Sequence, residues 1–112
     1  IVLGIGRYTA GGGYARVADD AGASYAKRGW ARVAWNAYNS ANGEVRPAIG
    51  DVDGDGLGEI VLGLGTYASA GGYVYVAGDA SRNYNPMRWV RAGDSAYNAS
   101  NGESWPAVGR VR

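Results

Sequence analysis

The sequence predicts an all-β fold of short antiparallel strands, and three observations carry this prediction. The 112-residue chain contains 20 glycines without a collagen-like period, which is typical of many turns and bulges. Its apolar runs are short and rich in β-branched and aromatic residues, as over 73–76. No segment keeps an apolar period of 3.6 residues, so we expect no helix.

An internal repeat organises the whole chain. Residues 1–53 align without a gap with residues 60–112, at an offset of 59, and about half of the aligned pairs are identical. Tyr8 matches Tyr67, for example, and Trp30 matches Trp89. We therefore predict one domain over 1–112, built from a repeat at 1–59 and a repeat at 60–112.

Each repeat has the material for four strands. In the second repeat these are 60–64, 73–76, 89–92 and the C-terminal 105–112; residues 30–35 and 46–50 are counterparts in the first. Turn-forming residues fill 10–13, 19–24 and 36–43. Four strands in 59 residues are close to one β-propeller blade, so we predict two four-stranded antiparallel blades per chain, with strand order B-C-D-A-B-C-D-A. A solenoid or a sandwich is the alternative.

Composition excludes several classes of function. Without cysteine or histidine the chain cannot form disulfides or zinc-thiolate sites, and it lacks the commonest general base. No base lies near a serine, so we expect no enzyme. The formal charge of +1 offers no basis for binding nucleic acid, and the apolar runs are too short for membrane insertion.

The acidic segment 51–59 is the chemical centre of the sequence. Carboxylates stand at its first, third, fifth and ninth positions, and glycines at the fourth, sixth and eighth. Ca²⁺ prefers six to eight oxygen ligands, and the glycines allow the tight coil that such a site needs. The candidate ligands are Asp51, Asp53, Asp55, the Leu57 carbonyl and Glu59. A solvated acidic turn is the alternative, whereas an EF-hand would require flanking helices.

This loop, with the apolar strand 60–65 behind it, resembles the FG-GAP or VCBS repeat of integrin-α-like propellers. The resemblance covers the chain as two blades and implies that the loop joins the first two strands of a blade and holds Ca²⁺ through the five residues just named. The family usually has Asp at the ninth position, so Glu59 is a departure that keeps the charge. Its rings commonly have seven blades, a number that chains of two blades cannot make.

The end of the second repeat departs from the metal-binding pattern. Arg110 and Arg112 occupy the places of Asp51 and Asp53, so we expect one calcium site per chain. Two blades would leave strand edges and apolar faces exposed. We therefore expect a homo-oligomer, a trimer of six blades or a tetramer of eight, in which residues 105–112 join the sheet that begins at residues 1–6 of another copy. A surface calcium loop fits an extracellular or cell-surface location.

Aromatic and amide residues recur late in each repeat. The candidate ligand-binding residues are Trp35, Tyr38, Asn39, Tyr97, Asn98 and Trp105. Aromatic rings stack on sugars while amides bind hydroxyls, so these residues suit a glycan site between blades; packing of blade on blade is the other interpretation. Two functions stay open: a calcium-binding, non-enzymatic interaction scaffold, or a lectin-like propeller module.

Overall fold

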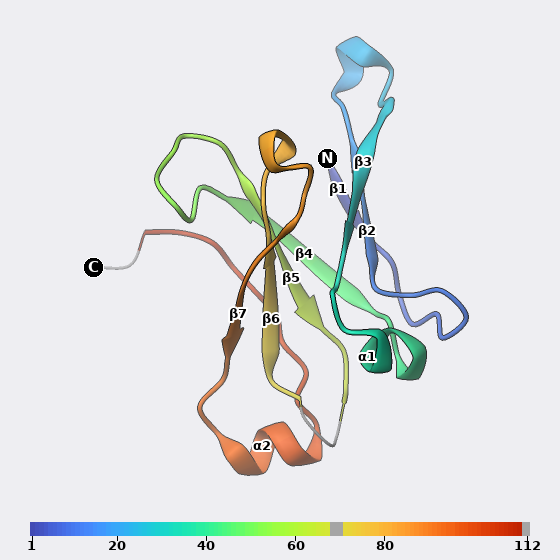
Figure 1. Ribbon diagram of the computed structural model, residues 1–112, viewed down its shortest axis with the longest axis vertical. Coiled ribbons are helices and arrows are strands. Elements are labelled where there is room, and N and C mark those ends of the chain that lie inside the picture. The colour runs from blue at the N-terminus through green and yellow to red at the C-terminus, as the bar shows by residue number, and fades with distance from the viewer. Residues whose placement is uncertain (68–70, 111–112) are drawn as a thin grey trace.

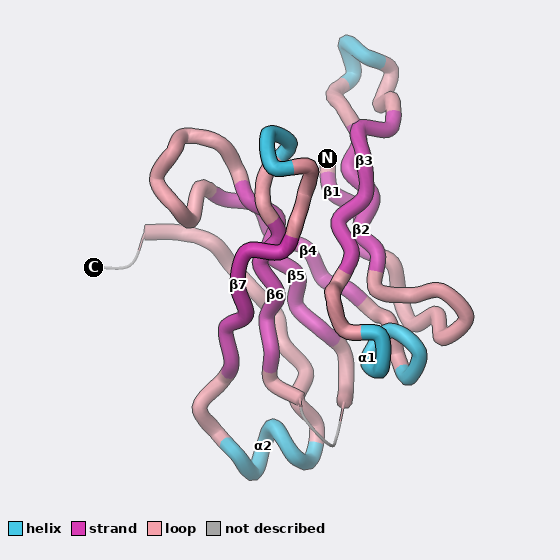
Figure 2. The backbone as a smooth tube through the Cα atoms, viewed as in Figure 1, coloured by secondary structure: helices cyan, strands magenta, loops and turns pink. Residues whose placement is uncertain are grey.

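The computed structural model describes residues 1–67 and 71–110 and is all-β, as predicted, with two antiparallel sheets (Figures 1 and 2). Each sheet is a meander in which sequence neighbours pair. Sheet A contains β1 (Val2–Gly4), β2 (Tyr14–Ala18) and β3 (Lys27–Arg32). Sheet B contains β4 (Val45–Gly50), β5 (Glu59–Leu64), β6 (Tyr73–Ala77) and β7 (Pro86–Arg91).

The expectation that the chain has no helix is wrong. Two α-helices, α1 (Asn36–Ala41) and α2 (Ser95–Ser100), and two 3₁₀ turns, η1 (Ala21–Ala23) and η2 (Ala80–Arg82), connect the strands. Six residues are too few to show a helical period, and local capping helps to hold α2: the Asp94 carboxylate accepts from the Tyr97 N–H at 2.9 Å. In the described part of the chain, no helix is long and apolar enough to cross a membrane.

The two sheets share one plan. Val2 pairs with Val17 in sheet A, and at the same offset of 59 Val61 pairs with Val76 in sheet B. The register shifts directly after Val17 and again directly after Val76. Residues at equivalent positions of the two repeats therefore have equivalent backbone environments, which makes each repeat an internal control for the other.

The hydrophobic core lies between the sheets. Ile60, Leu62 and Leu64 project from one face of β5 and are 2%, 0% and 2% exposed. Opposite them, Ala15 of β2 and Ala31 of β3 are fully buried, and their small side chains let the sheets approach closely.

The other face of sheet A has no such cover. Leu3, Arg16 and Trp30 are cross-strand partners and lie in one row, so they share this face. Ile1, Leu3 and Ile5, the equivalents of the three buried β5 residues, are 58%, 51% and 36% exposed. This apolar face is thus exposed to solvent in sheet A, whereas the equivalent face of sheet B is buried.

The C-terminal segment, expected as a strand over 105–112, is not one in its described part. Residues 105–110 have no strand partner, and residues 111–112 lie outside the described residues. The segment nevertheless follows the path of β4: the Ser104 N–H donates to the Leu64 carbonyl at 2.9 Å, as the Val45 N–H donates to the Ile5 carbonyl at 2.9 Å. β4 is a strand because it pairs with β5, the first strand of the following repeat. Residues 105–110 have no such following strand to pair with among the described residues.

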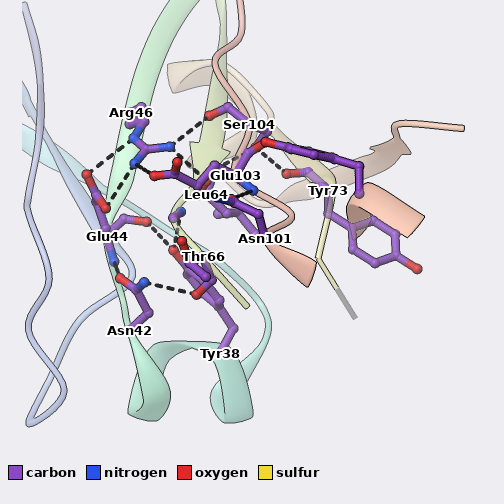
Figure 3. Close-up of polar contacts among 12 residues, drawn as sticks. Tyr38, Asn42, Glu44, Arg46, Leu64, Thr66, Tyr73, Asn101, Glu103 and Ser104 are labelled. Carbon is purple, nitrogen blue, oxygen red and sulfur yellow. Dashed lines mark hydrogen bonds and ion pairs between the residues drawn. The ribbon is translucent and has the colours of Figure 1, made fainter. Parts of the chain in front are cut away.

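Arg46 anchors this segment to sheet B (Figure 3). Its guanidinium forms ion pairs with Glu44, at 3.1 Å, and with Glu103, and also donates to the Leu64 carbonyl at 3.2 Å. The same group lies 3.7 Å from the centre of the Trp105 ring. A planar cation with five N–H donors can satisfy both carboxylates and stack on the ring at once, so it joins two consecutive repeats at equivalent positions.

Candidate functional site

The acidic loop joins β4 to β5 and lies at the same end of the molecule as η2, opposite α1 and α2 (Figure 1). Hydrogen bonds within the loop hold its turn: the Asp51 carboxylate accepts from the N–H groups of Gly54 at 2.6 Å and Gly56 at 2.9 Å. Both glycines have positive φ, 85° and 87°, which other residues rarely adopt. The backbone therefore already has the tight turn that a cation-binding loop requires.

The remaining predicted ligands have different surroundings. Asp55 accepts from the Leu57 N–H at 2.8 Å on the exposed surface. Asp53 forms an ion pair with Arg82 of η2 at 2.7 Å. Glu59 is fully buried at the start of β5, where one of its oxygens, Oε2, accepts from the Val52 N–H at 2.8 Å.

Asp79, directly before η2, completes the acidic cluster. The residue is 3% exposed, and one of its oxygens, Oδ1, accepts from the N–H and hydroxyl of Ser81 at 2.7 and 2.6 Å. Carboxylate oxygens of Asp55, Glu59 and Asp79 lie within 4.8 Å of one another, as do oxygens of Asp51, Asp53 and Glu59. Sequence reasoning missed Asp79 and Arg82 because they stand twenty or more positions beyond the loop, although a meander brings alternate connections to one edge.

Hydrogen bonding keeps two of these carboxylates charged. N–H groups, first that of Gly56 and then that of Gly54, hold the pKa of Asp51 below its usual value. The Ser81 hydroxyl, followed by the N–H groups of Ser81 and Arg82, lowers the pKa of Asp79 against the opposing effect of burial. Both groups are therefore anionic at neutral pH, the form in which a carboxylate binds a metal.

The donor set fits a hard cation. The oxygen clusters that the structure shows consist of carboxylates, which suit Ca²⁺ rather than a thiophilic metal. Two buried carboxylate oxygens, Oε1 of Glu59 and Oδ2 of Asp79, have no hydrogen-bond partner. Such atoms are costly to bury alone, and a bound cation would satisfy them.

The six candidate ligand-binding residues divide into packing and exposed positions. Tyr38 is fully buried: its hydroxyl donates to the Glu44 carbonyl at 2.6 Å and accepts from the Gly65 N–H at 2.6 Å. Asn39 and Asn98 are each 3% exposed and donate to the carbonyls that precede α1 and α2, those of Val33 and Ala92. Tyr97 and Trp105 are exposed, and Trp35 is half-buried.

Trp35 belongs to an aromatic cavity between the sheets. The cavity has a volume of about 450 Å³ and is lined by Ala34, Trp35, Tyr73 and Trp89. The Trp35 ring lies edge-on to Tyr73, with centroids 5.8 Å apart, and to Trp89, 6.0 Å apart. Sequence reasoning did not include Tyr73 and Trp89, which belong to strands of the other repeat and reach Trp35 only through sheet packing.

In comparisons with protein-family models, curated proteins and solved structures, nothing matched this chain.

Proposed function

We propose that this chain is a calcium-binding piece of a β-propeller that acts as a non-enzymatic interaction scaffold and closes into a ring with further copies of itself. The observation that carries the proposal is a pair of equivalent apolar rows, of which one is buried between the two sheets and the other is exposed. Ile60, Leu62 and Leu64 are buried against sheet A within the chain, whereas Ile1, Leu3 and Ile5 present an equivalent row to solvent.

A complementary surface lies at the opposite end of the chain. On the far side of sheet B, a groove is lined by side chains of β5, β6 and β7 together with Val52 and Asp53 of the acidic loop and the C-terminal segment. Its apolar members include Val61, Val74, Val76, Val90, Pro106 and Val108. The equivalents of its four valines on β5, β6 and β7 are Val2, Ala15, Val17 and Ala31, which lie in sheet A and belong to the core or pack against it. Sheet A of a second copy would therefore dock here as sheet B docks on sheet A within one chain.

The C-terminal segment supports the same arrangement. Residues 104–110 cross sheet B where β4 crosses sheet A, so in the docked pair they would lie along β1 of the neighbouring copy. This would complete its three-stranded sheet with a fourth, inner strand and remove an exposed edge. The contact is head-to-tail, so three copies would close six blades and four copies eight.

Light scattering tests the assembly directly. We expect a particle of three or four times the 11.6 kDa chain mass, stable on dilution. A folded monomer at micromolar concentration would contradict the ring.

Titration calorimetry tests the calcium site. We expect one Ca²⁺ per chain, bound with a dissociation constant on the order of 10⁻⁵ to 10⁻³ M, as in surface loops of extracellular modules. A flat titration, together with a melting temperature that does not respond to calcium or chelator, would contradict the site.

The aromatic cavity favours a second candidate function, carbohydrate binding. Three rings around an open cavity of about 450 Å³ can stack on the apolar face of a sugar. A glycan array would identify the ligand class, and Trp35→Ala should abolish the signal while the protein stays folded. An array without any hit would leave the scaffold as the proposed function.

A further inference from the structure

We infer that Asp79 is a ligand of the calcium ion, so that the ion clamps the β4–β5 loop onto the turn between β6 and β7. The inference rests on the proposed calcium site and changes what that site does. If the loop supplied every ligand, the cation would order that loop alone. With a ligand from the residue before η2, the cation links the β4–β5 loop to the β6–β7 turn.

The atoms free to bind a cation lie on the Asp79 side of the cluster. Both Asp51 oxygens accept N–H groups of the loop, and Asp53 Oδ2 is paired with Arg82. By contrast, Oε1 of Glu59 and Oδ2 of Asp79 are buried without a donor, in residues that are 0% and 3% exposed. Together with Asp55 these two residues form one of the oxygen groups that span less than 4.8 Å.

Electrostatics favours a cation at this position. Anionic carboxylates whose oxygens lie within 4.8 Å of one another repel each other. Burial strengthens the repulsion and deprives the carboxylates of water. The nearby cation Arg82 pairs with Asp53, so Oε1 of Glu59 and Oδ2 of Asp79 still have no hydrogen-bond donor. A divalent ion coordinated by both would offset the repulsion and satisfy both oxygens.

The first repeat shows that the turn itself does not bury this aspartate. Asp20 is the equivalent of Asp79 and caps η1 in the same way, with its Oδ1 accepting from the Ala23 N–H at 3.2 Å, yet Asp20 is exposed. The capping role is therefore common to both aspartates. What distinguishes Asp79 is the acidic loop, which brings carboxylate oxygens of Asp55 and Glu59 within 4.8 Å of one of its own.

Calcium titration of Asp79→Asn, with Asp20→Asn as the matched control, tests the inference. Asparagine keeps an oxygen that can cap η2 but removes the charge of the ligand. We expect calcium affinity to fall by at least about ten-fold in Asp79→Asn and by less than about two-fold in Asp20→Asn, since that carboxylate is exposed and lies in the other repeat. Equal affinities of both variants and the wild-type chain would overturn the assignment.

Hydrogen exchange of the wild-type protein gives a second readout that needs no variant. Calcium should slow amide exchange in η2 as well as in the acidic loop, because one ion would hold both, and should leave η1 unchanged. Protection confined to residues 51–59 would overturn the role of Asp79 while leaving the calcium site intact. A wild-type chain that binds no calcium would instead overturn the site itself, and this inference with it.

Discussion

Replacing Leu3 with glutamine should weaken the assembly without unfolding the chain. Leu3 is 51% exposed on the uncovered face of sheet A, whereas its equivalent Leu62 is 0% exposed in the core. Docking of a second copy would therefore bury about half of the Leu3 side chain, which contributes about 1 kcal/mol. The glutamine amide would also lose its water without a partner, at a cost of about 1–3 kcal/mol.

The expected loss is about 2–4 kcal/mol per contact between copies, or roughly 30- to 1,000-fold in the association constant. A copy that leaves a closed ring breaks two such contacts, so the effect on ring dissociation is about twice as large. Light scattering over a dilution series should show Leu3→Gln falling to monomer at concentrations where the wild-type chain stays assembled. Leu57→Gln is the matched control, because Leu57 is 50% exposed but lies outside β1 and does not line the groove of sheet B. Equal assembly of both variants would refute the docking face.

Three further predictions concern the buried tyrosine and the metal. Tyr38→Phe leaves the Gly65 N–H and the Glu44 carbonyl without a partner and should lower the free energy of unfolding by about 2 kcal/mol; Tyr97→Phe, whose hydroxyl makes one exposed hydrogen bond, should cost less in the same denaturant titration. Burial raises the pKa of Tyr38 to about 12, so with rising pH this tyrosine ionises first in the unfolded chain. Its contribution to the free energy of unfolding should therefore be constant below pH 10 and fall by about 2–3 kcal/mol between pH 10 and 12. Tyr38→Phe should show a smaller fall. Arg82→Ala, which copies Ala23 of the first repeat, removes a cation from the proposed calcium site, and calorimetry should show calcium binding roughly three-fold tighter. Unchanged or weaker binding would show that Arg82 does not oppose the ion.

Strands were the most predictable part of this fold. β5 and β6 coincide closely with the apolar runs at 60–64 and 73–76, because β-branched and aromatic residues suit an extended backbone. β7 begins at Pro86, three residues before the expected start at Trp89, since its N-terminal part has no apolar pattern and is ordered by pairing with β6. The short helices could not be found by periodicity, because each is less than two turns long.

The aromatic-amide segments show where residue type alone is ambiguous. Tyr38 and Asn39 have the chemistry of a sugar site, but both are buried, and the Tyr38 hydroxyl and the Asn39 amide nitrogen donate to the backbone carbonyls of Glu44 and Val33. Trp35 has the same kind of ring and remains at a cavity, because Tyr73 and Trp89 of the other repeat stand around it. Which residues pack and which can reach a ligand depends on contacts between repeats.

The sequence by itself determined the repeat, the all-β class and the position of the acidic loop, because these depend on local spacing and on residue chemistry. Only the tertiary structure decided that Leu62 is buried while Leu3 is exposed, and that Asp79 lies against Glu59 while Asp20 faces solvent. Equivalent residues in the two repeats have the same local sequence preferences. Their burial differs because sheet A covers one face of sheet B and the β4–β5 loop covers one of the two turns, and such contacts join residues far apart in the chain.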